Sequence, residues 1–457
     1  MSEPETHLQG AGQVPVPRTL PIDTIDKRQL DQDALRVISR LERHGYEAYL
    51  VGGCVRDLMV GRRPKDFDVA TGANPRQVKR LFRNGRIIGR RFRLVHIHYG
   101  DHIVETATFR RDPFRRDQSD EDGGGSGDVG DVEDLLITED NVFGTAEEDA
   151  RRRDFTVNAL FLDPTRGQIL DYVGGFDDLD ARLLRTIGDP KVRLAEDPVR
   201  ILRAVKFATR LGFRIEDETW KAMCELTPLL ERSAPPRVLE EILRLMRSGT
   251  SLGAFRMLRS CGALRVILPD IDAYLESQTA DEATNGLWSL LEALDADVHA
   301  GFAPTTPVCI AILFSGLIDR EADPETRLGP GEPRDLQTVA GEILEPLTIA
   351  ARLSRRDCGR ARRIVVQQRR FTQAPTKRFR PLLFMRSEDF PEALALFRLR
   401  TAAHGEGWDI YEGWVGRYEL AQTASEDEME QERRRTRRRR RRRRRRGRSE
   451  DGAPPPE

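Results

Sequence analysis

The sequence predicts an α+β protein in which a small mixed head precedes a long all-helical part and a basic tail. Short apolar runs with the alternation of strands occur only before about residue 189. From there to about residue 423, segment after segment has apolar residues at helical spacing. The chain then ends in an arginine-rich stretch that cannot bury a core.

These changes of character divide the chain into successive parts. An acidic, glycine-rich stretch at 117–134 is predicted to be a mobile insertion in the head. The predicted parts are a disordered leader at 1–30, the head at 31–188, a first helical part at 189–268, a second at 269–423, and a disordered basic tail at 424–457.

The net charge of zero hides a strong asymmetry between the globular part and the tail. Residues 433–448 contain 14 arginines, which leaves 61 of the 75 basic residues against 75 acidic ones in the rest of the chain. A solvated basic block on an acidic body is typical of an arm that binds nucleic acid, and an inert solubilising tail is the alternative. No apolar run is long enough to span a membrane, and five widely separated cysteines favour reduced thiols in a cytoplasm.

The most informative stretch runs from Tyr49 to Ala70. A short apolar strand leads into Gly52-Gly53 and then into a helix, an arrangement that lets backbone amides approach a phosphate. Asp66 and Asp68 follow, two apart on a predicted strand, so both carboxylates are expected on one face. Such a pair beside a phosphate site suits Mg²⁺ bridged to a nucleotide; the alternative is a glycine turn before a charged edge strand.

A third carboxylate could come from either of two places. Glu105 lies on a neighbouring predicted strand, and Asp154 follows the run Arg151-Arg152-Arg153. Arg153 would suit a triphosphate because guanidinium binds phosphate oxygens in pairs, and Asn158 would share the helical face of Asp154 or return to the sheet. An outward-pointing strand Glu and a helix-capping Asp are the alternatives.

Further along, Asp197 and Arg200 are three apart at the start of a predicted helix, so they share a face. Asp197 could simply cap that helix. A carboxylate beside a guanidinium also matches the edge of adenine or cytosine, and would select these bases without a template. Arg203 and Lys206 extend the same basic face and could hold phosphates or a primer. His96 and His98 alternate on a strand, but no further ligand at a suitable spacing supports a metal site.

The motifs GGCVRDL, KDFDVA, RRRDFTVNAL, DYVGGFDDL and EDPVRILRAVKFATRLGF, spread between Tyr49 and Leu264, resemble those of the class II nucleotidyltransferases. That family contains bacterial poly(A) polymerases and the CCA-adding enzymes. The stretch LFRNGRIIGRRFRLVHIHYG, residues 81–100, is similar to the one that marks the poly(A) polymerases. The resemblance implies a polymerase-β-like nucleotidyltransferase head, a helical neck that reads the base, and a helical body and tail for RNA.

The resemblance also implies roles for residues of this chain. Asp66 and Asp68 become the metal-binding catalytic carboxylates, with Asp154 or Glu105 as the third. The acidic insertion after Pro113 departs from the family and puts the loop geometry in doubt. The residues expected to bind nucleotide are Gly52, Gly53, Arg56, Arg153, Asn158, Asp197, Arg200 and Arg203.

The expected activity is template-independent addition of AMP from ATP to RNA 3′ ends, with two Mg²⁺ ions and release of pyrophosphate. This would promote mRNA processing and decay, with the arginine-rich tail binding RNA backbone or RNA-decay partners and no membrane involved. One alternative is an enzyme that adds CCA to tRNA. The other is a non-catalytic protein that binds RNA through its basic tail.

Overall fold

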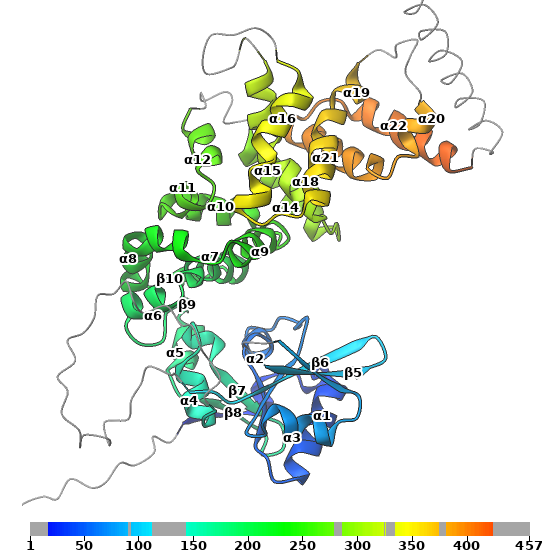
Figure 1. Ribbon diagram of the computed structural model, residues 1–457. Helices are drawn as coiled ribbons and strands as arrows, with labels where there is room; N and C mark the ends of the chain where they lie inside the picture. The colour runs from blue at the N-terminus through cyan, green and yellow to red at the C-terminus, as the bar shows by residue number, and fades with distance from the viewer. Residues whose placement is uncertain are drawn as a thin grey trace, which may run out of the picture. The chain divides into compact units, whose positions relative to one another are not determined.

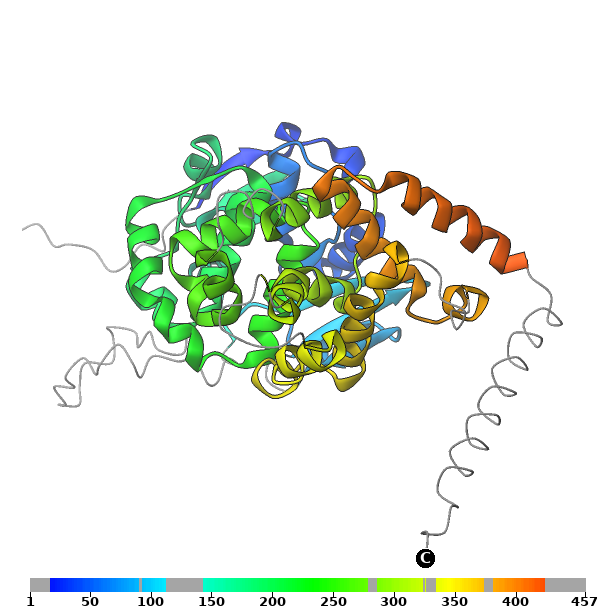
Figure 2. The same ribbon diagram turned by 90° about the horizontal axis from the view of Figure 1, so that it is seen from above.

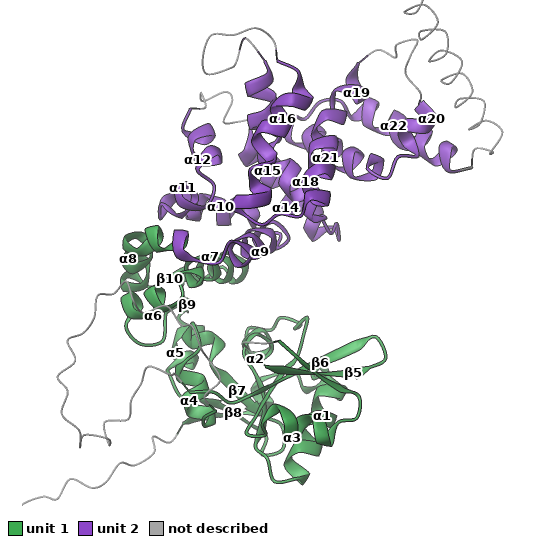
Figure 3. Cartoon of the chain, viewed as in Figure 1, with its two compact units in different colours: residues 1–230 green, residues 231–457 purple. Residues whose placement is uncertain are grey.

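The computed structural model describes residues 17–89, 93–111, 143–277, 286–323, 325, 334–373 and 381–423. The predicted insertion at 117–134 and the predicted tail at 424–457 lie outside the described residues. The chain divides into two compact units, Met1–Leu230 and Glu231–Glu457 (Figure 3). The boundary falls inside the segment 189–268, which the sequence suggests is one helical part.

An eight-stranded sheet forms the head (Figures 1 and 2). Its strand order is β1-β8-β7-β2-β3-β6-β5-β4, and β3 and β6 are parallel while the other neighbours are antiparallel. The strands are β1 (Arg18–Pro21), β2 (Ala48–Val51), β3 (Asp68–Thr71), β4 (Gly85–Ile88), β5 (Leu94–Tyr99), β6 (His102–Thr108), β7 (Leu160–Asp163) and β8 (Gln168–Asp171).

The helices of the head begin where the local sequence supplies caps. Asp31 accepts a hydrogen bond from the Ala34 amide at the start of α1, and Asn74 forms a reciprocal capping box with Gln77 in α3. The sequence Asn74-Pro75 predicts a helix start with Asn74 as the cap and Pro75 in the first turn, and the structure confirms this. The helices are α1 (Gln32–Arg43), α2 (Gly53–Met59), α3 (Pro75–Leu81), α4 (Ala146–Arg151) and α5 (Gly175–Asp180).

The predicted leader is partly ordered. Residues 18–21 form β1, which pairs antiparallel with β8 from Arg18 opposite Asp171 to Pro21 opposite Gln168. The segment RTLP has no alternation to reveal a strand, and its pairing partner lies about 150 residues away in the chain. The ordered part of this segment therefore belongs to the head, and the prediction of disorder up to residue 30 is wrong for residues 18–30, which also include two short 3₁₀ helices.

Helices follow the head within the first unit. A break at Asp197 and Pro198 separates α6 (Pro190–Glu196) from α7 (Val199–Leu211), where the sequence predicts a continuous helix from Ala195. Asp197 has extended backbone angles, and Pro198 is the N-cap residue of α7. The remaining elements of this part are β9 (Leu183–Leu184), paired in parallel with β10 (Arg214–Ile215), then α8 (Asp217–Leu226) and the 3₁₀ turn Thr227–Arg232.

Among its described residues, the second unit contains helices and no strand, and it confirms the predicted α+β class with a helical second half. None of the described helices is both long and apolar enough to cross a membrane. Its helices are α9 (Pro235–Met246), α10 (Ser251–Ser260), α11 (Ala263–Ile267), α12 (Pro269–Glu276), α14 (Leu287–His299), α15 (Thr306–Ala322), α16 (Leu336–Leu344), α17 (Leu347–Ala350), α18 (Arg355–Gln367), α19 (Arg369–Thr372), α20 (Pro381–Met385), α21 (Phe390–His404) and α22 (Trp408–Thr423).

Candidate active site

The glycine turn between β2 and α2 lies directly beside the first residue of β3. Val51, which ends β2, is the register partner of Asp68, which begins β3. Gly52 has φ +74°, a conformation that residues with a Cβ rarely adopt. A Cβ at Gly52 would also lie 3.0 Å from Nη1 of Arg153. The turn thus brings glycine backbone, a guanidinium and a carboxylate into one place.

Two further carboxylates lie close to Asp68. β3 and β6 are parallel, with Val69 opposite Thr106, so the preceding residues Asp68 and Glu105 are neighbours across the strands. Asp66 lies in the loop two residues before β3, whereas the sequence places both aspartates on one strand. Each of these two carboxylates contributes to the electrostatic environment of Asp68.

The electrostatics of Asp68 show how much negative charge is gathered here. Neighbouring protein atoms partly desolvate its carboxylate, and this together with the charge of Glu105, and less so Asp66, raises its pKa to about 6, against the opposing effect of Arg153. The side chain nevertheless keeps solvent contact at the start of β3. An accessible group of hard oxygen donors with mutual repulsion is a fitting place for a divalent cation.

Asp154 is placed differently, although the sequence makes it an equal candidate for the third carboxylate. It is 8% exposed, and both its oxygens have partners. Oδ1 accepts from Nδ2 of Asn158 at 3.0 Å, and Oδ2 accepts from Nε of Arg203 at 2.7 Å. Burial would raise the pKa of Asp154, but the charge and hydrogen bonds of these partners, chiefly Arg203, lower it well below the usual range. Asp154 therefore organises neighbouring side chains, and Glu105 is the carboxylate beside Asp68.

Arg56 is one of the largest fully buried side chains, with 1% exposure. Its Nε and Nη2 donate to Oδ1 of Asp57 at 2.9 and 2.6 Å, and its Nη1 donates to Oδ1 of Asn158 at 2.5 Å. Burial lowers the pKa of Arg56 despite the Asp57 charge. All three nitrogens of this guanidinium donate to protein side chains. Arg56 therefore stabilises the buried side of the glycine turn.

Arg153, by contrast, faces the turn. Asp149 holds its Nε and Nη2 at 3.2 and 3.0 Å, and its Nη1 donates to the carbonyl of Asn158 at 3.3 Å. The guanidinium also lies 5.2 Å from the ring centre of Phe161. These contacts hold a positive charge beside Gly52, where a phosphate would need it.

At the break between α6 and α7, Arg200 is paired with a residue that the sequence analysis did not single out. Its Nη1 donates to Oε2 of Glu196 at 3.1 Å and to the carbonyl of Arg193 at 2.5 Å. Glu196 also accepts from Nη1 of Arg193 at 2.6 Å, and both glutamate and arginines are buried. Arg193 in turn donates to the carbonyls of Arg152 and Arg153. The spacing of three and four residues around Glu196 was the signal that could have revealed this cluster.

Three cationic side chains surround the ring of Phe207 in α7. The charged ends of Arg56, Arg203 and Lys206 lie 5.0, 5.3 and 5.0 Å from its ring centre, within the range of cation–π attraction. Because Arg203 also binds Asp154, α7 is tied to the segment that carries Arg153. The predicted basic face of α7 is therefore not only a charged surface, because Arg203 on this face also binds Asp154 of the head.

Two histidines of the head, His96 and His102, lie close to carboxylates. Nε2 of His96 lies 3.3 Å from Oε2 of Glu105 on the paired strand. A separate group of possible ligands, Asp31, Asp33 and His102, gathers at the start of α1 and β6. That group lies apart from the glycine turn and contains none of the predicted site residues.

Comparison with known proteins agrees with this arrangement. Residues 48–185 match the poly A polymerase head domain, 212–275 the probable RNA and SrmB-binding site of polymerase A, and 332–449 the polymerase A arginine-rich C-terminus. The CCA-adding enzyme of Bacillus stearothermophilus, solved in complex with CTP, superposes with a TM-score of 0.58 at 25% identity, covering 85% of this chain and 81% of the other. Fold and site together define a nucleotidyltransferase.

The sequence relatives narrow the family. Poly(A) polymerase I of Haemophilus influenzae is 33% identical over 407 residues, which are 89% of this chain and 88% of that protein. The Salmonella typhi poly(A) polymerase I is 43% identical over 57% of this chain, a region that covers about half (54%) of that relative's length. A CCA-adding enzyme of Geobacillus kaustophilus is 35% identical over 56% of this chain. The chain belongs to the bacterial poly(A) polymerase family of class II nucleotidyltransferases.

Proposed function

We propose that this chain adds AMP from ATP to the 3′ ends of RNA without a template and releases pyrophosphate. The observation that carries the proposal is the register of β2 and β3, which puts Asp68 beside the Gly52-Gly53 turn, with Asp66 and Glu105 close by. Nucleotidyl transfer requires carboxylates that can hold metal ions beside a backbone turn that can bind phosphates.

Asp66 and Asp68, with Glu105 as the third carboxylate, would hold the two Mg²⁺ ions. The oxygen donors fit this ion. Burial, and after it the charges of Glu105 and Asp66, raise the pKa of Asp68, and a bound cation would stabilise the ionised carboxylate against these effects. When bound, magnesium lowers the pKa of the attacking 3′-hydroxyl and neutralises the departing pyrophosphate. Asp154 is proposed to act by holding Arg203 and Asn158 in place.

The triphosphate is proposed to bind at Gly52 and Gly53, with Arg153 supplying positive charge. The absence of a Cβ at both glycines leaves room for close approach of the phosphate oxygens. Arg56, Asn158 and Arg203 are proposed to contribute mainly by fixing the turn and α7, because Asn158 links Arg56 to Asp154, and Asp154 binds Arg203.

Asp197 and Arg200 are proposed to read the base. They lie where α6 gives way to α7, and their backbones are linked by a hydrogen bond from the Arg200 amide to the Asp197 carbonyl, at 3.0 Å. Glu196 would hold the guanidinium of Arg200 in a fixed direction. A carboxylate acceptor next to a guanidinium donor favours adenine and cytosine over guanine and uracil.

The decisive experiment separates poly(A) addition from CCA addition, because the two activities share this chemistry. Purified protein is incubated with a short RNA and ATP, and in parallel with tRNA lacking its CCA end together with CTP and ATP. A long homopolymer of A on the RNA supports the proposal. A product of three added nucleotides, confined to the tRNA, would overturn it.

The proposal extends to RNA as the partner, to a role in mRNA processing and decay, and to a cytoplasmic location, which the five unpaired cysteines support. The arginine-rich tail is proposed to bind RNA backbone. Removing residues 426–457 should weaken RNA binding and flatten its dependence on salt, since fewer phosphates are neutralised. An unchanged salt dependence would contradict this role of the tail.

A further inference from the structure

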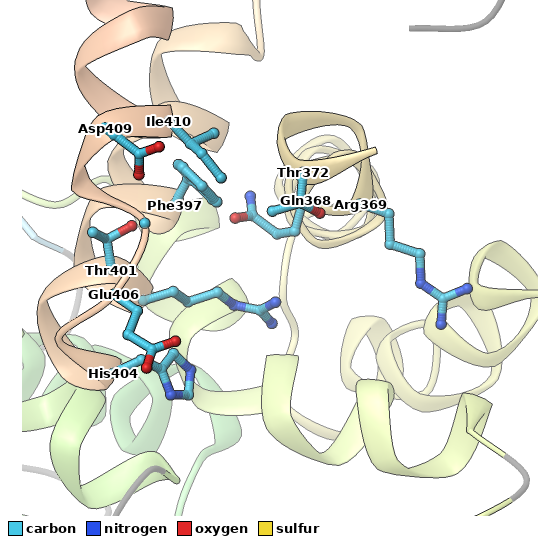
Figure 4. A pocket seen from close by; sticks show the side chains of 11 residues that line it. Gln368, Arg369, Thr372, Phe397, Thr401, His404, Glu406, Asp409 and Ile410 are labelled. Atoms are coloured by element: carbon cyan, nitrogen blue, oxygen red, sulfur yellow. The ribbon is translucent and has the colours of Figure 1, made fainter. Parts of the chain in front are cut away.

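A pocket of about 520 Å³ lies in the second unit, and none of the residues assigned to the active site lines it (Figure 4). It is formed by the junction of α18 and α19, by the C-terminal half of α21 and by the start of α22. Figure 4 shows Gln368 and Thr372 on one side, facing Phe397 and Ile410 on the other. Its size is in the range of small-molecule sites.

Gln368 gives this pocket an unsatisfied hydrogen-bond acceptor. Its Nε2 donates to the carbonyls of Ile364 and Ala393 at 2.9 and 3.0 Å, which fixes the direction of the amide. Its Oε1 is buried and has no hydrogen-bond partner in the described residues, and the side chain as a whole is 4% exposed. A buried acceptor without a partner is costly, so an N–H or O–H entering the pocket would be bound favourably after a small local adjustment.

The charged residues of the pocket are of both signs. Arg369 is exposed and has no ion pair among the described residues, whereas Nη2 of Arg400 is held by Asp319 at 2.6 Å. Glu406 and Asp409 add two exposed carboxylates. One exposed arginine beside two carboxylates matches a single phosphate together with hydroxyl or amino donors, which is what one nucleotide of a chain presents.

The apolar side of the pocket consists of Phe397 and Ile410. One face of the Phe397 ring is stacked on Phe371, with centres 4.8 Å apart and planes 21° apart, so the ring is held rigidly. The fixed Phe397 ring and the aliphatic Ile410 form an apolar wall against which a planar base can pack.

From these features we propose that the pocket binds one nucleotide of the RNA substrate, at a position other than the 3′ end that is extended. Its base packs against Phe397 and Ile410, and an amino group of the base donates to Gln368. Arg369 binds one phosphate of this nucleotide, and one of the two carboxylates accepts a hydrogen bond from its 2′-hydroxyl. The inference relies on RNA being the substrate, as proposed above.

The test compares neighbouring substitutions that differ only in whether they touch the pocket. Arg369→Ala removes a charge from the pocket, and Arg370→Ala removes the same charge from a residue that instead lies over Phe384. Thr372→Trp fills the pocket, and Gln373→Trp places the same bulk on an exposed residue outside it. Affinity for a fluorescent oligo(A) RNA is measured at fixed salt without ATP or Mg²⁺.

Arg369→Ala and Thr372→Trp should each weaken binding about tenfold, the effect expected from losing one bound base. Arg370→Ala and Gln373→Trp should change it less than about threefold. Equal affinity in all four variants would overturn the inference. So would binding of free AMP that Thr372→Trp abolishes while RNA affinity stays unchanged. Transfer of AMP to a primer is measured separately, because its failure in the unaltered protein would refute the proposed function and not the pocket.

Discussion

Val51 and Asp68 are direct register partners at the ends of two antiparallel strands. The glycine turn follows Val51 at once, and Asp68 is the first residue of its own strand, so this one pair of residues positions the glycine turn, where the phosphates are proposed to bind, relative to Asp68. Their relative position depends on backbone pairing, which is more rigid than contact between long side chains.

Replacing Asp68 by Ala should reduce AMP transfer at least about a thousandfold, because the variant lacks a proposed metal ligand of the chemical step. Asp33→Asn is the matched control, since Asp33 belongs to the separate acidic group at α1. Primer extension measures the activity, and circular dichroism checks the fold of both variants. Substantial polymerisation by the Asp68 variant would remove the metal site from this position.

Glu105→Gln should mainly affect catalysis, whereas Asp154→Asn should mainly affect stability. Glu105→Gln should lower kcat about a hundredfold with little change in the free energy of unfolding, because Glu105 is half-buried and is itself proposed as the third metal ligand. Asp154→Asn should lower the free energy of unfolding by about 2 kcal/mol, because it weakens buried hydrogen bonds to Asn158 and Arg203. Urea unfolding and single-turnover kinetics separate the two effects. The reverse assignment would make Asp154 the third carboxylate.

The raised pKa of Asp68 predicts a pH dependence of stability in metal-free protein. Because its folded-state pKa, about 6, lies above the ordinary value of 3.8, the folded chain keeps this proton longer than the unfolded chain. Stability of the wild type relative to Asp68→Asn should therefore fall as the pH rises from about 4 to about 6, and stay constant above that. Urea unfolding in EDTA across this range measures the difference. A difference that is independent of pH would show that the pKa is not raised.

Gly52→Ala should lower the free energy of unfolding by about 1 to 2 kcal/mol, because its φ of +74° is strained for a residue with a Cβ. Gly61→Ala has nearly the same strain, φ +69°, with no atom within 4 Å of the added Cβ. Only Gly52→Ala should also raise the KM for ATP, because its methyl group displaces Arg153. Equal KM values in the two variants would separate Arg153 from triphosphate binding.

Glu196→Gln should lower the free energy of unfolding by about 3 kcal/mol, because the buried charges of Arg193 and Arg200 lose their partner. It should also reduce the preference for ATP over GTP about tenfold, because Arg200 would no longer be held in one direction. Glu225→Gln, which removes an exposed partner of Lys191, should leave the free energy of unfolding nearly unchanged. Incorporation of each nucleotide and thermal unfolding provide the measurements. An unchanged preference for ATP over GTP would show that Glu196 contributes to stability and not to base selection.

The sequence predicts much of the head because its strongest signals are local. The strand before Gly52, the glycine turn, and the cap at Asn74 depend on residues close in the chain, and the structure has them where they were expected. Burial is not a local property. Arg56 is expected to face the triphosphate, yet its environment depends on Asn158, about 100 residues later.

The same limit applies to charge pairing. Arg200 is three residues from Asp197 and four from Glu196, and both spacings fit a helix. The helix breaks at Asp197, which leaves Glu196 as the buried partner. The choice between Glu105 and Asp154 likewise depends on which strand pairs with β3, and this pairing is fixed by tertiary packing.

The strand at Arg18–Pro21 affects how the protein can be shortened. It occupies one edge of the sheet, where it covers the hydrogen-bonding groups of β8. Trimming the chain beyond this strand would leave those groups open to pairing with a strand of another molecule. Shortened versions that begin after residue 21 are therefore expected to self-associate, even though every residue of the glycine turn and the carboxylate group would still be present.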